Sequence, residues 1–285
     1  MKIRKKLNFK RVKYIFLSGV IIGITMFLYA HYEYTDIKIE TLEIVSEDIP
    51  EEFDGKKAVF IADFQLDTRT KFNKKQLEKI IKLVNEQEKD IIILGGDYTN
   101  WTGKIPLFYK EMEKLGKPEY GVYAVLGNHD YNSVRKNIES LKKLGYKILV
   151  NGNDKITVNN QSIYISGVDD LWKGMPDADK AFNGIKKGDF NIYITHNPDY
   201  FEEMTENQKK IADITLAGHT HGGQITFFGK IVLAPIKYKE KYGYGLKEYG
   251  GHKIYITSGL GGSAFGMFVR FFARPEIVVL KLKKK

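Results

Sequence analysis

The chain opens with a short basic stretch, continues into one long apolar run, and then alternates short apolar runs with polar segments. The short runs are rich in Val and Ile and lie between stretches of helical periodicity, a pattern typical of a layered α/β domain. The predicted strands are 58–62, 91–94, 122–126, 162–165, 191–195, 211–217, 253–257 and 276–282. The predicted helices are 73–86, which Asn73 caps, 105–114, 134–143 and 199–206.

The long apolar run covers residues 14–32 and contains no Asp, Glu, Lys or Arg. As a helix that rises 1.5 Å per residue, it would be about 28 Å long, close to the hydrocarbon thickness of a bilayer. A cleavable secretory signal is the alternative, but its apolar part is usually shorter and ends in small residues, whereas this run ends in LYAHY. We therefore interpret the run as an uncleaved transmembrane anchor.

Charged residues are distributed unevenly on the two sides of this run. Residues 1–13 carry seven Lys or Arg and no acid, whereas residues 33–48 carry six acids against a single lysine. By the positive-inside rule, the N-terminus is expected in the cytoplasm and the rest of the chain outside it, as a single-pass protein of the cell membrane. The expected segments are a basic cytoplasmic segment (1–13), a transmembrane anchor (14–32), a connecting segment (33–54) and one α/β domain (55–285).

Composition excludes several classes of protein. With 43% hydrophobic and 28% charged residues the chain is globular, and without cysteine it has no disulfide, thiolate zinc site or Cys nucleophile. The net charge of +10 is concentrated at the two ends, because the first thirteen residues hold seven cations and the last five hold four lysines. The remainder is nearly neutral, so it offers no broad basic surface to a phosphate backbone, and nucleic acid is not expected as a partner.

Polar residues of the kinds that ligate metals follow five of the predicted strands. The carboxyl ends of strands in α/β sheets form ligand crevices, so these residues are expected to converge on one site. Their oxygen and nitrogen atoms, without sulfur, suit Mn²⁺, Fe or Zn²⁺ better than Ca²⁺. In chain order, the residues are Asp63, Gln65, Asp97, Asn128, His129, Asp130, His196, His219 and His221.

The order of these motifs, with GD, GNHD, a lone His and GHTH after the first Asp, resembles the calcineurin-like metallophosphoesterase family. The resemblance covers residues 55–280. The GHTHGGQI stretch and the ending SGLGGSAFGMFVRFFARPEIVVLKL are similar to a branch of membrane-associated bacterial phosphoesterases and lipid A precursor pyrophosphatases. The resemblance to this family implies an α/β metallophosphoesterase sandwich of two mixed β-sheets flanked by helices, here preceded by one N-terminal transmembrane helix.

The same resemblance implies two divalent metal ions, Mn²⁺ first and Fe or Zn²⁺ as alternatives, which activate a water for attack on phosphorus. It implies a catalytic role for Asn128, and for His129 as a contact to phosphate or the leaving group, with Asp130 orienting the His129 imidazole. The implied metal ligands are Asp63 and His221 for the first ion, Asn128, His196 and His219 for the second, and Asp97 for both.

One position departs from the family pattern, because Gln65 stands where the family normally has histidine. A glutamine carbonyl is a weaker, neutral oxygen donor, so two outcomes are open. Gln65 ligates a hard ion such as Mn²⁺ with a water completing the site, or it leaves the first metal site weak. Asp67 on the same loop could compensate, but we interpret it as a solvated loop acid, and the pair 169–170 as an acidic turn.

Residues 264–275 (AFGMFVRFFARP) combine aromatic residues with two arginines. One interpretation is a loop that enters lipid and presents Arg270 or Arg274 to a substrate phosphate, since arginine matches phosphate geometry. The other is core packing that leads into the last strand. Both interpretations stay open at this point.

The function predicted from the sequence is hydrolysis of a phosphoester or diphosphate by a membrane-anchored, metal-dependent enzyme. Its substrate would be a phosphorylated small molecule or a lipid-linked compound. One alternative is UDP-2,3-diacylglucosamine pyrophosphohydrolase activity in lipid A synthesis, whose cytoplasmic substrate conflicts with the expected topology. The other is a non-catalytic metal- or phosphate-binding protein that Gln65 has weakened at the first metal site.

Overall fold

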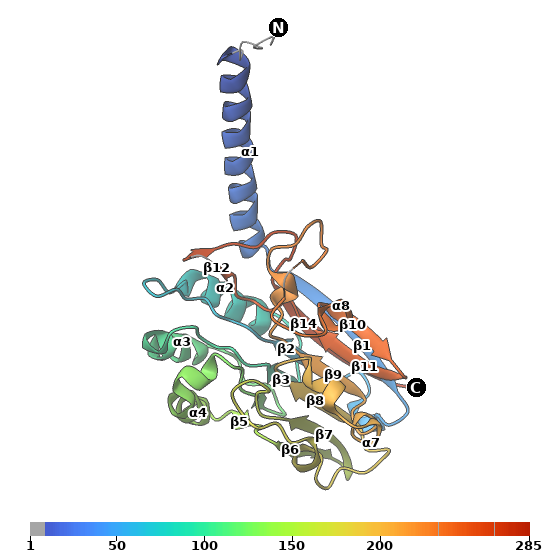
Figure 1. Cartoon of the computed structure of the whole chain (residues 1–285). Coiled ribbons are helices and arrows are strands. Elements are labelled where there is room, and N and C mark those ends of the chain that lie inside the picture. Colours follow the sequence, from blue (N-terminus) through green and yellow to red (C-terminus); the bar gives the residue numbers. More distant parts are fainter. Residues whose placement is uncertain (1–8, 233, 265) are drawn as a thin grey trace.

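A long N-terminal helix stands out from an α/β body in the computed structural model, which describes residues 9–232, 234–264 and 266–285 (Figure 1). Helix α1, Phe9–Thr35, extends the predicted apolar run at both ends. It is the one helix in these described ranges that is long and apolar enough to cross a membrane. Part of the predicted basic segment, residues 1–8, lies outside the described residues.

The first sheet has six strands in the order β1-β14-β2-β3-β4-β5. Strand β1 pairs in parallel with β14, β14 is antiparallel to β2, and the strands from β2 to β5 run parallel. The strands are β1 Lys38–Ser46, β14 Glu276–Lys284, β2 Lys57–Ile61, β3 Ile91–Leu94, β4 Val122–Ala124 and β5 Lys147–Ile148.

The segment 33–54, expected to be a connection, supplies the edge strand of this sheet. Only Asp36 and Ile37 separate α1 from β1, and β1 pairs with β14 along its whole length. Its charged and apolar residues alternate, as in KIETLEIVS, which suits an edge strand with one face toward solvent. The α/β body therefore begins directly at the end of α1.

The second sheet also has six strands, in the order β10-β11-β9-β8-β7-β6. Its four central strands are parallel and its two edge strands are antiparallel to their neighbours, so both large sheets are mixed, as predicted. The strands are β10 Gly245–Tyr249, β11 His252–Ile256, β9 Ile214–Ala217, β8 Asn191–Thr195, β7 Gln161–Gly167 and β6 Gly152–Val158; a small hairpin joins β12 Ser263–Ala264 and β13 Met267–Phe268.

Three hydrophobic layers hold the sandwich together. Phe60 and Ile93 of the first sheet pack against Ile192 of the second in the layer between the sheets. Helices on the outer face of each sheet complete the other two layers. These helices are α2 Lys74–Asn85, α3 Ile105–Met112 and α4 Val134–Lys143 on the first sheet, and α5 Ala178–Ala181, α6 Tyr200–Glu203 and α8 Lys239–Tyr242 on the second. The short helix α7, Glu206–Lys209, has no buried residue.

Two local features test the predicted helices. Asn73 caps α2 by accepting a hydrogen bond from the Gln76 N–H, as predicted. The single helix predicted at 199–206 is wrong, because Met204 is extended and separates α6 from α7. Thr205 and Gln208 form a capping box that begins a new helix at this point.

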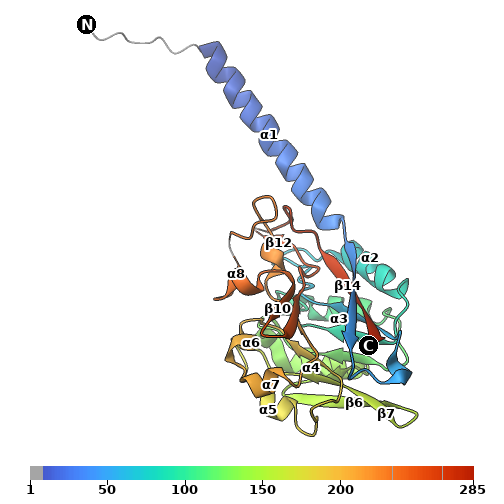
Figure 2. The ribbon, with the colours of Figure 1, turned by 90° about the vertical axis from the view of Figure 1, so that its right-hand side faces the viewer.

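Strand direction determines which end of the sheets carries the site. Strand β1 begins two residues after α1 and runs away from it, so the register directs β2, β3 and β4 back toward the foot of α1 (Figures 1 and 2). The carboxyl ends of these three strands therefore lie at the end of the domain that adjoins the long helix.

Candidate metal centre

Residues that follow strands of both sheets meet at this end of the domain. Asp97 follows β3, His196 follows β8 and His219 follows β9, and each offers one ligand atom within 4.8 Å of the others. His196 Nε2 lies 3.3 Å from Asp97 Oδ2 and 3.2 Å from His219 Nδ1. All three side chains are buried, so the sheets assemble a compact cluster of potential metal ligands.

The two imidazoles are oriented by their outer nitrogens. His196 Nδ1 lies 2.8 Å from the carbonyl oxygen of Gly95, and His219 Nε2 lies 3.0 Å from that of Pro235. A carbonyl oxygen only accepts, so each outer nitrogen carries the proton and each inner nitrogen presents a lone pair. This is the usual orientation of histidines that ligate a metal.

Two lone pairs that face each other at 3.2 Å need a cation between them. A proton can fill this role: although burial opposes a charge on His196, the neighbouring Asp97 carboxylate raises the pKa of this imidazole to about 10. Burial, followed by the charge on His196, lowers the pKa of His219 to about 3. Without metal, protonated His196 therefore donates to His219, and a divalent cation that binds the same two nitrogens and Asp97 would replace this proton.

Asp63 and His221 lie on the other side of the cluster. Both carboxylate oxygens of Asp63 accept the backbone N–H of His219 at 3.0 Å. The Nε2 atoms of His196 and His221 each lie 4.0 Å from Asp63 Oδ1. Burial raises the pKa of Asp63 to about 7 and lowers that of His221 well below its usual value, which keeps this imidazole neutral and able to ligate.

Gln65 contacts the predicted bridging carboxylate directly. Its Nε2 donates to Asp97 Oδ2 at 2.8 Å, and the backbone N–H of His129 donates to Asp97 Oδ1 at 2.9 Å. Burial opposes the charge on Asp97, but the adjacent His196 outweighs it and holds the pKa of this carboxyl below its usual range. Gln65 therefore lies beside the cluster and presents its NH₂ group to it.

Polar atoms without partners line the same site. Asn128 Oδ1, His129 Nδ1 and His221 Nδ1 are buried and have no hydrogen-bond partner among the described residues. Leaving a buried donor or acceptor unpaired costs about 1–3 kcal/mol. Three such atoms on residues with predicted catalytic or ligand roles support a site that is completed by ions and substrate.

Asp130 does not orient the His129 ring, contrary to the expectation from the sequence. Its carboxylate instead accepts the backbone N–H groups of Asp97, Tyr98 and Gly127 at 2.8–3.0 Å. Burial raises its pKa to about 8, while these three donors act in the opposite direction. Asp130 therefore links the loops after β3 and β4 and positions Asp97.

The backbone at the site is strained. Five of the predicted ligands have positive φ, a conformation that costs about 1–3 kcal/mol for a residue other than glycine and that clusters at functional sites. Gly127 is required here, because a Cβ on this residue would lie 2.2 Å from Asp97 Oδ1. The five residues are Asp63 (51°), Gln65 (32°), Asp97 (57°), His219 (70°) and His221 (52°).

The two predicted substrate-binding arginines lie in different places. Arg270 is fully buried, and its guanidinium donates to the carbonyl oxygens of Gly261, His221 and Ala273 at 2.6, 2.8 and 3.2 Å. Its Nε and Nη1 are held by these carbonyl groups behind the His221 loop, whereas its Nη2 is buried without a hydrogen-bond partner in the described residues. Arg274 is more exposed, pairs with Asp36 at 3.0 Å, and lines a pocket at the foot of α1.

Three further residues near the site were missed or misinterpreted from the sequence. Asp67 is buried, not solvated, and it accepts the N–H groups of residues 100 and 101. Asp170 is also buried, its Oδ2 has no hydrogen-bond partner in the described part of the chain, and it follows β7 as the ligands follow their strands. The ring of Trp172 stands edge-on to His219 at 4.4 Å, and no pattern in the sequence indicates this contact.

The sandwich and its buried ligand cluster define a metal-dependent phosphohydrolase class. Residues 56–223 match the family model for calcineurin-like phosphoesterases, which is more than half of the chain, and the protein belongs to this family. The family expected from the motifs is therefore confirmed, and the chain is a hydrolase of this kind.

Named relatives are similar over most of the chain. The uncharacterized metallophosphoesterase YkuE of Bacillus subtilis is 34% identical over 86% of each chain. The phosphodiesterase YaeI of Escherichia coli is 32% identical over 79% of this chain and 82% of its own. A transmembrane protein with metallophosphoesterase domain from Danio rerio is 29% identical over 87% of this chain, which spans 57% of that protein.

Proposed function

We propose that this chain is a membrane-anchored hydrolase that cleaves a phosphoester or diphosphate with two divalent cations, Mn²⁺ first. The observation that carries the proposal is the opposed pair of lone pairs on His196 and His219 beside Asp97. Asn128, His196 and His219 would hold one cation, and Asp63 and His221 the other, with Asp97 between them. Gln65 would become a ligand of the cation held by Asp63 and His221 if its side-chain amide rotated so that the oxygen, and not the NH₂ group, faced the cluster.

The chemistry that bound divalent cations supply is a lowered pKa for an attacking water and neutralisation of phosphoryl oxygens. In the reaction, water forms a new bond to phosphorus, the bond from phosphorus to the leaving oxygen breaks, and that oxygen takes up a proton. His129 lies beside the cluster with an unpaired Nδ1, so it would contact the phosphoryl group or provide that proton. Asp130 positions Asp97, and Arg270 positions the His221 loop.

Anchoring and orientation are part of the proposal. Helix α1 contains an 18-residue window whose mean hydropathy is 1.8, and none of the residues in that window is buried. The seven cations before it and the acids after it support a cytoplasmic N-terminus and a domain on the opposite side.

The test uses full-length protein in detergent with bis(p-nitrophenyl) phosphate as a generic phosphodiester. Chelation should abolish hydrolysis and Mn²⁺ should restore it. Asp97→Ala should lower kcat/KM by at least about 1,000-fold, because it removes the carboxylate shared by both cations. Glu139→Ala, which removes a carboxylate from the exposed face of α4, is the matched control. Undiminished activity in Asp97→Ala would refute the two-cation proposal.

A further inference from the structure

The metal centre lies at the end of the domain that adjoins the long helix. The direction of β2 and β3 brings Asp63 and Asp97 to this end, and His196 and His219 join them from the second sheet. If α1 spans a bilayer, the centre faces that bilayer.

Two hydrogen bonds connect the helix to the metal centre. The backbone N–H of Arg270 donates to the carbonyl oxygen of Ala30, which belongs to the apolar run of α1, at 2.9 Å. The side chain of the same arginine donates to the carbonyl oxygen of His221 at 2.8 Å. Arg270 therefore links the predicted ligand His221 to the end of α1 that adjoins the domain.

A cluster of aromatic side chains, here called the aromatic collar, lies against the foot of the helix and consists of Tyr29, Phe227, Phe228, Phe271 and Phe272. Tyr29 contacts Phe271 and Phe272 at centroid distances of 5.4 and 5.5 Å, and Phe228 contacts Phe272 at 5.0 Å. Phe227 and Phe228 remain 66% and 75% exposed, which is unusual for phenylalanine facing water. Apolar side chains at this level are expected to enter the bilayer interface.

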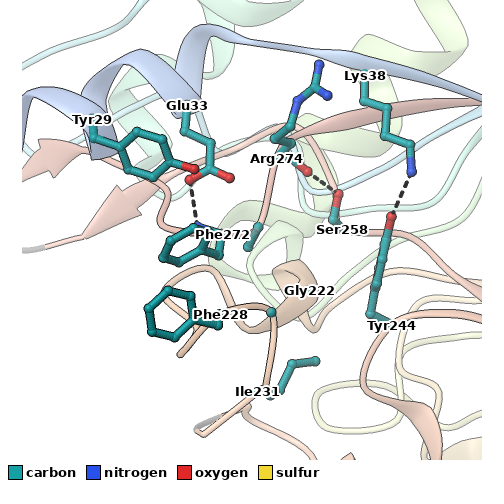
Figure 3. Close-up of a pocket in the computed structure, with 12 residues that line it drawn as sticks. Tyr29, Glu33, Lys38, Gly222, Phe228, Ile231, Tyr244, Ser258, Phe272 and Arg274 are labelled. Carbon is teal, nitrogen blue, oxygen red and sulfur yellow. Dashed lines mark hydrogen bonds between the residues drawn. The ribbon is translucent and has the colours of Figure 1, made fainter. Parts of the chain in front are cut away.

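A pocket of about 540 Å³ opens between the helix foot and the collar (Figure 3). Tyr29, Phe228 and Phe272 form its aromatic side, and Lys38 and Arg274 lie on the other side. These two cations pair with partly exposed carboxylates at 2.6 and 3.0 Å, and such pairs are weak enough to yield to an anionic group.

The pocket also borders the metal centre. Its wall includes Gly222, which directly follows His221, and Ser258, which directly precedes Gly259. A Cβ on Gly259 would lie 2.6 Å from the Cβ of Asp63, so this wall packs against a predicted ligand. A molecule in the pocket would therefore lie against the loops that carry His221 and that pack on Asp63.

We propose that the substrate is an anionic membrane lipid whose headgroup carries a phosphoester or diphosphate. The aromatic side of the pocket takes the part of the lipid next to the headgroup, and Lys38 with Arg274 neutralises the anionic headgroup. Water attacks phosphorus, the bond to the leaving oxygen breaks, and that oxygen is protonated. This inference rests on the proposed hydrolytic function and specifies its substrate class.

The experiment compares lipid and soluble substrates with one preparation of full-length protein in phosphatidylcholine vesicles with Mn²⁺. The lipid probes are phosphatidic acid and diacylglycerol diphosphate, and the soluble probes are glycerol 3-phosphate and bis(p-nitrophenyl) phosphate. Native protein should hydrolyse at least one lipid probe about tenfold faster than glycerol 3-phosphate, measured as kcat/KM. Phe228→Ser should lower the ratio of lipid to bis(p-nitrophenyl) phosphate hydrolysis about tenfold, the loss expected for one buried aromatic contact.

Leu107→Ser, which changes an exposed apolar residue on α3, should leave that ratio unchanged. Hydrolysis of the soluble diester without either lipid probe would overturn the lipid inference and leave the hydrolase intact. An equal loss on lipid and soluble substrates in Phe228→Ser would also overturn it. Inactivity on all four probes would refute the proposed function, and this inference with it.

A second measurement does not depend on turnover. Both native tryptophans are replaced by phenylalanine, and one tryptophan is introduced at position 228 or at position 107. A lipid with a spin label near its headgroup should quench Phe228→Trp fluorescence in vesicles but leave Leu107→Trp unchanged. Equal quenching at the two positions would show that the collar does not contact the bilayer and would overturn the inference.

Discussion

The two ends of the central sheets both bury carboxylates but differ in how they hold them. At the helix end, Asp63 and Asp97 lie among imidazoles, strained backbone and polar atoms without partners. At the opposite end, Asp213 precedes β9 and has a partner for each oxygen. The Ser46 hydroxyl donates to Oδ1 at 2.7 Å and the Asn191 N–H to Oδ2 at 2.9 Å.

The helix end is therefore a site that requires added ions, whereas the hydrogen bonds of Asp213 at the opposite end are complete within the chain. Asp213 joins the second sheet to β1 of the first, so its role is accounted for by packing. At the helix end, buried polar atoms of Asn128, His129 and His221 lack partners in the described residues, and five predicted ligands have positive φ. Substitutions at the helix end should therefore change activity most, and substitutions at the opposite end should change only stability.

After the loss expected for Asp97→Ala, the next largest effect is that of Asp63→Asn at the helix end. Phosphodiester hydrolysis should fall at least about 100-fold, because a neutral amide is a poor ligand for a hard cation. In metal-free protein at pH 8, however, the melting temperature should rise by a few degrees. Burial raises the pKa of Asp63 to about 7, so the charged carboxylate is costly there and the amide removes that cost.

Calorimetry of protein treated with a chelator measures the melting temperature, and an assay with Mn²⁺ measures the loss of hydrolysis. Asp154→Asn, on the edge strand β6, is the control and should leave activity unchanged. A lower melting temperature for metal-free Asp63→Asn would mean that the helix end is built for stability like the other end.

A smaller change at the same end is expected from Gln65→His. Imidazole nitrogen is a stronger ligand than an amide oxygen, so the Mn²⁺ concentration for half-maximal activity should fall about tenfold. The variant also removes the hydrogen bond from Gln65 to Asp97. Metal titration of activity and of bound ion measures the change, and an unaltered midpoint would show that position 65 does not reach the cation.

The smallest effect is expected from Asp213→Asn at the opposite end. Burial raises the pKa of Asp213 to about 6, above its value in the unfolded chain. Its favourable contribution is therefore complete below about pH 4 and is lost as the pH rises through 6. Above pH 7 the variant should be about 1 kcal/mol more stable than native protein, and this advantage should vanish near pH 4.

Denaturant unfolding at several pH values measures the difference in the free energy of unfolding between variant and native protein. Asp179→Asn, which changes an exposed carboxylate, is the control. A pH-independent difference would mean that Asp213 stays charged in the folded protein. Reduced hydrolysis in Asp213→Asn would contradict the separation between the two ends.

The core strands and the ligand cluster were predictable from the sequence because both depend on local patterns. The Ile-rich runs at β3 and β8 are buried on both faces; two glycines separate β3 from Asp97, and His196 follows β8 directly. Strand direction then brings Asp97 and His196 together, so the site follows once the strands are placed.

The features that were missed depend on contacts between distant segments. The alternation in β1 was visible, but its place beside β14 depends on pairing across more than 200 residues. Arginine is a residue type that binds phosphate, and only the positions of Gly261 and His221 show that Nε and Nη1 of Arg270 already donate to backbone carbonyl groups. The break between α6 and α7 depends on a capping box that competes with helix propensity.

The two-residue connection between α1 and β1 leaves little room for a hinge. With β1 paired along its length to β14, the helix and the sheet turn as one body. A bilayer thinner or thicker than the helix prefers is accommodated in part by tilt. If α1 spans a bilayer as proposed, such a tilt would swing the catalytic face relative to the membrane plane, and bilayer thickness would then set how closely the catalytic face approaches the lipid surface.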